Sequence, residues 1–180
     1  MNRVETTFHQ HFSKLCQALG QGGALLVSLD EAKRPNAMTI GWAQVGIIWG
    51  KPICTVLVRP SRYTFRCCNT TGDFTVNLPR LSQAEQVLFC GTKSGRDYDK
   101  FAECGFTPVP PRAPQMSSPF IAECGLAYEC RVVHYNDVLP PQLAPEIQES
   151  CYPSGDYHRI YFGEILSVHG VEDLDAWLAG

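Results

Sequence analysis

The segment "VRPSRYTF" at residues 58–65 gathers side chains that bind anions, directly after an apolar run. Arg59 and Arg62 carry planar guanidinium groups that match the geometry of a phosphate. Ser61 and Thr64 add two hydroxyl groups to the same short stretch. The chemistry that these residue types favour is the recognition of a phosphate group, and no nucleophile is needed for it.

The residues that follow favour a helix whose N-terminus lies at the same point. Pro60 or Ser61 can open it, and we expect it to run to about Asn69, with Gly72 as its stop. The free N–H groups and the positive dipole end of such a helix attract anions. We therefore predict a site for a terminal phosphate monoester, which carries about −1.5 to −2 charge. The alternative is an exposed basic helix start whose arginines are solvated.

The charge of the chain is unevenly distributed. The 180 residues have a formal net charge of −3, yet the segment from Ala32 to Gly72 contains no Asp or Glu. Its six basic residues are Lys33, Arg34, Lys51, Arg59, Arg62 and Arg66. A basic segment in an acidic protein predicts one local anionic ligand, and it argues against nucleic-acid binding, which needs a broad basic face.

Short apolar and β-branched runs separated by turns indicate a mainly β fold. Residues 23–60 read as strand, polar turn, strand, turn and strand, and "ICTVLV" at 53–58 is typical of a strand buried on both faces. Further strands are expected at 73–79 and within 120–139 and 158–170. With short helices between them, these strands predict a β-barrel with helical excursions, as one domain over residues 1–180.

Local patterns make three more specific predictions. Ser82 and Glu85 form a capping box, which predicts a short helix from Ser82, and a second helix is expected to end at Gly105. The alternation of apolar and polar residues from Leu126 to Val132 predicts a strand with one buried face. The proline-rich stretch at 107–119 is expected to be irregular, and residues 140–157 are expected to form a lid-like loop.

Nine cysteines form no CxxC pair and no zinc-ligand spacing. We interpret them as reduced, mostly buried thiols, with the vicinal pair Cys67–Cys68 as a candidate redox switch. The spacing of the histidines predicts no metal site, and no apolar run is long enough to span a bilayer. We expect a cytoplasmic protein without a membrane partner.

The segment "NAMTIGWAQVGIIWG" at 36–50 precedes the phosphate segment and suggests a flat ligand. Gly41 and Gly46 let the backbone approach such a ligand closely, and Trp42 and Trp49 supply large rings. The alternative is a barrel strand whose glycines mark bends and whose tryptophans fill the core.

Several motifs in the same order resemble one known family. "NAMTIGWAQVGIIWGKP", "VRPSRYTF", "TGDFTVNLP", "SGRDYDKFAECG" and "GDYHRIYFGEIL" are similar to the flavin reductase-like, FMN-binding split-barrel family of the flavoredoxin type. The resemblance runs from about Gly23 to Val168 and implies a Greek-key split β-barrel with short inserted α-helices. It also implies a homodimer that holds FMN near the subunit interface.

The resemblance assigns roles to individual residues. The positions that match the flavin-binding motifs are Met38, Thr39, Ile40 and Gly41 along the isoalloxazine ring, Arg59, Ser61, Arg62, Tyr63 and Thr64 around the phosphate and ribityl chain, and Ser94, Arg96 and Lys100 near the flavin. His158 resembles a histidine on the nicotinamide side, although Tyr157 stands where many relatives have that histidine, directly after the aspartate.

The implied activity is the transfer of a hydride from NAD(P)H to flavin, with FMN either bound or released after reduction. A second possibility is an electron carrier with tightly bound FMN and a protein redox partner. A third is a flavin-binding regulatory module without turnover. The sequence alone does not choose among the three.

Overall fold

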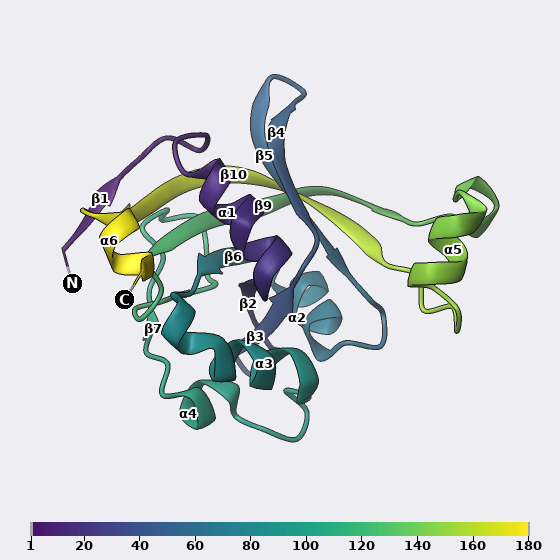
Figure 1. Cartoon of the computed structure of the whole chain (residues 1–180), viewed down its shortest axis with the longest axis horizontal. Coiled ribbons are helices and arrows are strands. Elements are labelled where there is room, and N and C mark those ends of the chain that lie inside the picture. Colours follow the sequence, from purple (N-terminus) through teal and green to yellow (C-terminus); the bar gives the residue numbers. More distant parts are fainter. Residues whose placement is uncertain (1, 180) are drawn as a thin grey trace.

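The computed structural model describes residues 2–179, and its centre is an eight-stranded antiparallel sheet (Figure 1). The strands follow the order β3-β2-β6-β9-β10-β5-β4, and β1 pairs with β10. Their bounds are β1 Arg3–Glu5, β2 Ala24–Leu29, β3 Pro35–Ile40, β4 Ala43–Ile48, β5 Lys51–Val58, β6 Asp73–Leu78, β9 Leu126–Asp137 and β10 Arg159–Val171. A separate two-stranded sheet joins β7 Pro108–Val109 to β8 Phe120–Ile121. The prediction of a mainly β fold is confirmed.

Short helices fill the connections between the strands. They are α1 Phe12–Gln21, α2 Tyr63–Thr71, η1 Leu81–Gln83, α3 Ala84–Thr92, α4 Lys100–Cys104, η2 Pro140–Gln142, α5 Pro145–Cys151 and α6 Leu174–Ala179. As expected, α2 ends at Gly72 and α4 ends at Gly105, and both glycines have a left-handed backbone conformation. The predicted capping box at Ser82 is wrong. The Gln83 side chain instead accepts a hydrogen bond from the backbone of Arg80, because a 3₁₀ turn precedes α3.

The second of the predicted strands is broken in two at Gly41 and Trp42. Within residues 2–179, β3 pairs only with β2 and β4 pairs only with β5, so the two segments lie at opposite ends of the strand order. The chain therefore crosses from one half of the sheet to the other at this bend. β4 and β5 form a hairpin that projects from the body, and the long strands β9 and β10 lead to α5 on an arm (Figure 1). The segment 140–157 thus contains a helix rather than only a loop.

The core has two parts. The larger part lies inside the curled sheet and includes the fully buried Phe74, Tyr128 and Tyr161. The smaller part lies between β2 and the helices α3 and α4, where Val87 and Phe101 pack. β2 is therefore buried on both faces, and α3 and α4 are held firmly against the back of the neighbouring strand β3.

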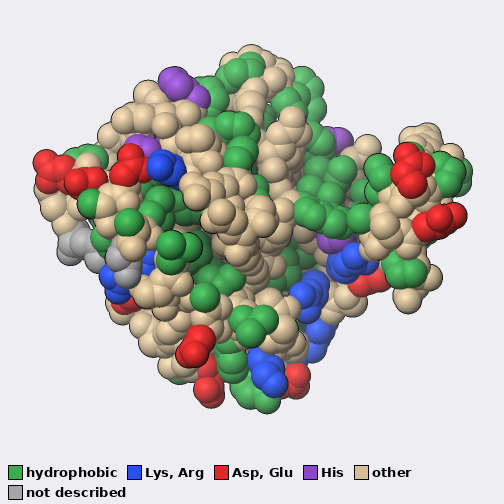
Figure 2. Space-filling model, in the orientation of Figure 1, with side chains coloured by type: hydrophobic (Ala, Val, Ile, Leu, Met, Phe, Trp, Pro, Cys, Tyr) green, Lys and Arg blue, Asp and Glu red, His purple; other side chains and the backbone are tan. Residues whose placement is uncertain are grey.

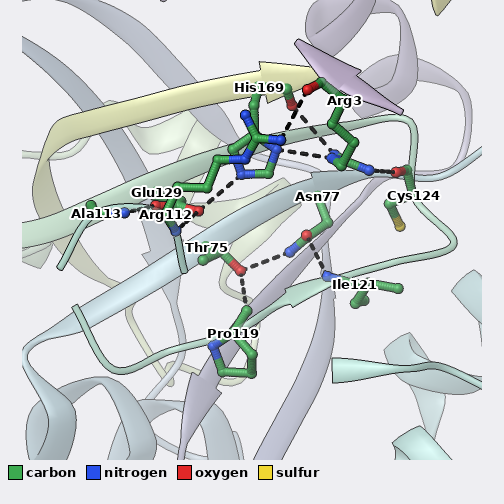
Figure 3. Close-up of polar contacts among 10 residues, drawn as sticks. All are labelled: Arg3, Thr75, Asn77, Arg112, Ala113, Pro119, Ile121, Cys124, Glu129 and His169. Atoms are coloured by element: carbon green, nitrogen blue, oxygen red, sulfur yellow. Dashed lines mark hydrogen bonds and ion pairs between the residues drawn. The ribbon is translucent and has the colours of Figure 1, made fainter. Parts of the chain in front are cut away.

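One face of β9 differs from the prediction. Ala127 and Glu129, expected on an exposed face, are both fully buried, and the irregular segment that follows β7 contacts Glu129. The Glu129 carboxylate accepts hydrogen bonds of 2.8 Å each from the backbone N–H groups of Arg112 and Ala113 (Figure 3). His169 lies 2.9 Å from the same carboxylate. A polar network thus occupies the position that the pattern assigned to solvent.

His169 connects this network to the N-terminal strand. Its Nδ1 atom accepts a hydrogen bond of 2.9 Å from Nε of Arg3 (Figure 3). Because an arginine can only donate, the hydrogen of the neutral ring lies on Nε2 and is donated to Glu129. The same arginine donates to the backbone oxygen of Cys124 at 2.6 Å. These contacts hold β1 against the barrel.

Three further findings concern membrane spans, metal sites and cysteines. No helix within residues 2–179 has the length and apolar character that a bilayer-spanning segment requires. Over the same residues, no three His, Cys, Asp or Glu side chains gather in a way that could hold a metal ion.

The nine cysteines are free thiols, most of them buried as expected. Cys67 and Cys68 are both buried in α2, and burial raises the pKa of Cys67 to about 11, so this pair has little thiolate at neutral pH.

Candidate functional site

A pocket of about 210 Å³ lies where the chain crosses between the two halves of the sheet. The end of β3 and the bend after it form one wall, the end of β5 and the turn before α2 form another, and the start of β10 closes the pocket. Its lining residues are Met38, Thr39, Ile40, Gly41, Trp42, Leu57, Arg59, Arg62 and His158. Positions that the sequence resemblance assigned to three separate motifs therefore meet in one cavity.

Basic side chains gather beside this cavity. Figure 2 shows a cluster of Lys and Arg side chains in the hollow between the main body and the arm that ends in α5, with a histidine next to them. Arg62 is the N-cap residue of α2, and no side chain caps the first backbone N–H groups of that helix. The positive end of the helix and the guanidinium groups therefore face the same region.

Ser61 binds a carboxylate in this structure. Its backbone N–H donates to Oδ1 of Asp156 over 3.2 Å, and its hydroxyl donates to Oδ2 over 2.5 Å. Asp156 has a left-handed backbone with φ of 57°, and it lies in the segment between α5 and β10. The carboxylate shows that the turn before α2 can bind an oxyanion with main-chain and side-chain donors together.

Arg59 is held by the same segment. Its guanidinium donates to the backbone oxygens of Cys151 at 2.8 Å and Asp156 at 3.0 Å. It also lies over the ring of Tyr152, 5.0 Å from the ring centroid. Two carbonyl contacts and one ring contact fix the direction of this guanidinium, and Arg59 lines the pocket. An anion that binds there would therefore cost little further side-chain entropy.

The helix α3 supports the opposite wall. Its last turn offers the backbone oxygen of Gly91, which accepts a hydrogen bond of 2.6 Å from Nη2 of Arg62. One turn earlier, the backbone oxygen of Val87 accepts from the hydroxyl of Thr39. A cation at the C-terminal end of a helix is favourable, so α3 both orients Arg62 and holds β3 in place.

His158 is buried, and its environment keeps it neutral. Its Nδ1 lies 2.8 Å from the hydroxyl of Tyr152, and its ring centroid is 4.9 Å from that of Trp42. Burial, followed by the nearby positive charge of Arg59 and Arg62, lowers the pKa of His158 to about 4. At neutral pH the ring therefore carries no charge, and it can exchange hydrogen bonds with a ligand without adding a cation to the pocket.

Two of the predicted side chains lie away from the pocket. Lys100 is almost fully buried behind β3, where its ammonium donates to the backbone oxygens of Ala37 at 2.9 Å and Cys90 at 2.8 Å. The expectation that it approaches the flavin does not fit this position, since both contacts tie α4 to its neighbours. The hydroxyl of Ser94 accepts a hydrogen bond from the backbone of Arg96 within its own loop.

The other predicted residues support the turn from behind. Arg96 donates to the backbone oxygen of Ser61 at 3.1 Å and lies over the ring of Tyr63. The Tyr63 hydroxyl points away from the pocket and donates to Asp30 at 3.2 Å. Thr64 is buried, and its hydroxyl accepts a hydrogen bond of 2.8 Å from Asn36.

Sequence reasoning missed Leu57, Tyr152 and Asp156. Leu57 belongs to the apolar strand segment and has no distinguishing pattern. Asp156 lies 95 positions after Ser61, so no local spacing could connect the two. The sequence suggests Trp42 as a large ring for a flat ligand, and in the structure this ring lines the pocket and contacts His158.

A second cavity of about 570 Å³ adjoins the first and shares Gly41, Trp42 and Leu57 with it. This groove runs along β4, β5 and α1 and is mostly apolar. The first cavity alone is smaller than most ligand sites, which range over roughly 300–1,000 Å³. The two cavities together offer an anion-binding end and a flat apolar end to one ligand.

Comparisons with known proteins identify relatives of this chain and structures with the same fold. The Escherichia coli (strain K12) protein YddH is 32% identical over 161 residues, which is 88% of this chain and 74% of YddH. The structure of flavoredoxin from Desulfovibrio vulgaris (Miyazaki F) matches with a TM-score of 0.66 at 27% identity, over 83% of this chain and 69% of that one.

A Shewanella frigidimarina structure described as having a split barrel domain matches with a TM-score of 0.67 at 22% identity, over 94% of this chain and 76% of that one. This likeness confirms the predicted split barrel fold. Residues 17–179 match the family described as "Flavin reductase like domain". The chain therefore belongs to the flavin reductase-like family.

Proposed function

We propose that this chain binds FMN, with the phosphate at the turn before α2 and the isoalloxazine ring along residues 38–41. The observation that carries the proposal is the convergence of Arg59, Arg62 and the uncapped start of α2 on the cavity that residues 38–41 line. The likeness to flavoredoxin supports the choice of ligand.

The donor set of the turn fits a phosphate monoester. Ser61 already gives two hydrogen bonds to a carboxylate, and a phosphate offers the same kind of oxygen with more charge. Arg62 uses one donor on Gly91, and a guanidinium group has five. The apolar side chains of Met38, Ile40 and Leu57 suit the ring system at the other end of the cavity.

FMN, when bound, supplies the redox chemistry by accepting a hydride. The chain has to hold the ring in one plane and leave one face open to the donor, within about 3–3.5 Å. The backbone of residues 38–41 and the anchored Thr39 fix that plane in this proposal. Trp42 and the neutral His158 flank the open side, where the histidine can exchange a hydrogen bond with the carboxamide of NAD(P)H.

We therefore propose an NAD(P)H-dependent flavin reductase, working in the cytoplasm, where reduced nicotinamide nucleotides are available. The likeness to flavoredoxin supports a second candidate, an electron carrier that keeps its FMN and exchanges electrons with a protein partner. Both functions use the same FMN site, and they differ in what reduces the flavin.

A second copy of the chain is part of the proposal. The β4–β5 hairpin exposes Ile47 and Trp49, whose exposed fractions are 60% and 62%. β4 is an edge strand within the described chain, and the apolar groove beside the first cavity runs along it. We propose that a homodimer covers this surface, because large exposed apolar side chains beside a free strand edge favour association.

One anaerobic titration separates the candidates. The purified protein is reconstituted with FMN, freed of excess ligand and followed by visible absorbance during additions of NADH or NADPH. Bleaching by either nucleotide, with steady turnover when free FMN is added, supports the reductase. Bleaching only by dithionite or by a reduced protein donor supports the carrier. Failure to retain FMN contradicts the carrier, and failure also to reduce added free FMN with either nucleotide contradicts both candidates.

A further inference from the structure

Two thiols on neighbouring helices touch each other behind the cavity wall. The Sγ atoms of Cys90 on α3 and Cys104 on α4 are 3.8 Å apart, although the residues lie 14 positions apart in the chain. Cys90 is buried, whereas Cys104 is partly exposed. The pair thus combines one thiol that an oxidant can reach with a second thiol in direct contact. Cys54 and Cys130 also interact, but both are fully buried.

We propose that Cys90 and Cys104 are a redox modification site, which closes to an intramolecular disulfide when the protein meets hydrogen peroxide. The Cys104 thiol loses its proton, the thiolate attacks the peroxide, and the O–O bond breaks. Cys104 becomes a sulfenic acid, and the hydroxide that leaves takes up the proton from Cys104 to give the first water. The Cys90 sulfur then attacks the Cys104 sulfur, the S–O bond breaks, and the second water leaves with the proton of Cys90. Two thiols are oxidised to one disulfide, and one peroxide is reduced to two waters.

The distance and the position of the helices allow this bond. The two Sγ atoms are 3.8 Å apart, which is close to van der Waals contact. A disulfide has an S–S distance of ~2.0 Å, so the sulfur atoms have to move ~1.8 Å closer. The two helices are joined by the loop 93–99 and pack on the same strand, β3. The proposed closure therefore combines rotation of the two side chains with a shift of the five-residue helix α4.

The electrostatic surroundings set the speed of the reaction. Burial raises the pKa of both thiols, and it brings that of Cys90 to about 12. The ammonium of Lys100 acts in the opposite direction on both. Because the thiolate of Cys104 is the attacking group, we expect disulfide formation to be slow at pH 7 and faster as the pH rises.

The crosslink would act on parts that hold the cavity. α3 supplies the backbone oxygens that fix Arg62 and Thr39. Lys100, on α4, bridges the backbone oxygens of Cys90 and Ala37, and Ala37 lies on β3. A disulfide between α3 and α4 would therefore hold the two helices that support β3 in one arrangement. This inference goes beyond the proposed function, and it holds whether or not the protein binds FMN.

Peptide mapping tests the proposal on the full chain. The starting protein carries Cys16→Ser and Cys151→Ser, so that these two more accessible thiols do not form crosslinks of their own. It is treated with hydrogen peroxide at pH 7 and pH 8.5, alkylated in denaturant and digested with trypsin without reduction. Cleavage after Arg80, Lys93, Lys100 and Arg112 separates the two thiols into peptides 81–93 and 101–112, each with one cysteine.

The expected result is a joined peptide of 81–93 and 101–112 that lacks two hydrogens, forms faster at pH 8.5 and separates on treatment with dithiothreitol. Adding Cys104→Ser should leave Cys90 as an alkylated thiol, whereas adding Cys54→Ser should leave the joined peptide in place. The proposal is overturned if Cys104 is oxidised to sulfinic or sulfonic acid with Cys90 alkylated. It is equally overturned if both cysteines remain alkylated after peroxide treatment.

Discussion

Asp156 and Ser61 form a two-point contact in which the backbone N–H and the hydroxyl of the serine both donate to one carboxylate. This contact joins the segment that precedes His158 to the turn that we propose as the phosphate site. An incoming phosphate would need the donors that Asp156 now uses. The carboxylate is therefore a competitor for the site as well as evidence that the site binds oxyanions.

We expect Asp156→Asn to tighten the binding of FMN by roughly three- to tenfold, because the change removes a negative charge from the phosphate site. Riboflavin, which has no phosphate, should bind the variant and the parent protein equally. Fluorescence titration of both flavins measures this difference. Asp137→Asn, which makes the same change of charge beside Arg159, is the control and should alter neither affinity. Weaker FMN binding by Asp156→Asn would show that the aspartate shapes the turn instead of competing for it.

Arg62→Ala should weaken FMN binding by roughly ten- to a hundredfold, the loss of one charged hydrogen bond to phosphate. Arg66→Ala is the matched control, because Arg66 lies one helical turn further on and pairs with Glu31 at the surface. Isothermal titration calorimetry of both variants with FMN gives the comparison. Equal losses in the two variants would mean that the basic segment acts only through its general field.

The positions of α2 and of the strands around the cavity could be predicted because their signals are local. A glycine after a helical run favours the end of the helix, as at Gly72 and Gly105, and the short β-branched apolar run at 53–58 favours a strand. The phosphate turn followed from the same local logic, since a strand end, Pro60 and a helix start lie within a few residues.

Residues whose roles depend on distant segments could not be predicted in the same way. The resemblance places Lys100 near the flavin, but its ammonium is buried because two backbone oxygens from other elements converge on it. Glu129 reads as the solvent face of a strand, and a proline-rich segment with no pattern of its own covers it. Such positions are decided by tertiary packing, which no short window of sequence contains.

Acidification should destabilise the protein between about pH 6.5 and pH 4, in part through His158. The pKa of this ring is about 4 in the folded protein and ordinarily about 6.5 when unfolded, so the unfolded state binds more protons in that window. The contribution of this neutral ring to the free energy of unfolding is therefore fully present above pH 6.5, and it is lost as the pH falls towards 4. Burial also lowers the pKa of His169 despite its bond to Glu129, so this ring adds a loss of the same sign.

The thermal unfolding midpoint, measured from pH 7.5 to pH 4, checks this expectation for the parent protein and for His158→Gln. The variant cannot take up a proton at this position, so its midpoint should fall less steeply. Because His169 is still present in this variant, a smaller dependence of its midpoint on pH should remain. Parallel curves for the two proteins would place the proton uptake elsewhere.

Glu129→Gln should lower the free energy of unfolding by about 1–3 kcal/mol, because all three neighbours of this buried carboxylate are donors. An amide has only one acceptor oxygen, and its NH₂ group must then face a backbone N–H or the Nε2–H of His169. That ring cannot turn to help, since its Nδ1 already accepts from Arg3. Urea unfolding measures the loss, and Glu31→Gln, the same substitution in an exposed ion pair, should leave the midpoint almost unchanged. An unchanged midpoint for Glu129→Gln would mean that Glu129 is protonated in the parent protein and that one of its three donors points elsewhere.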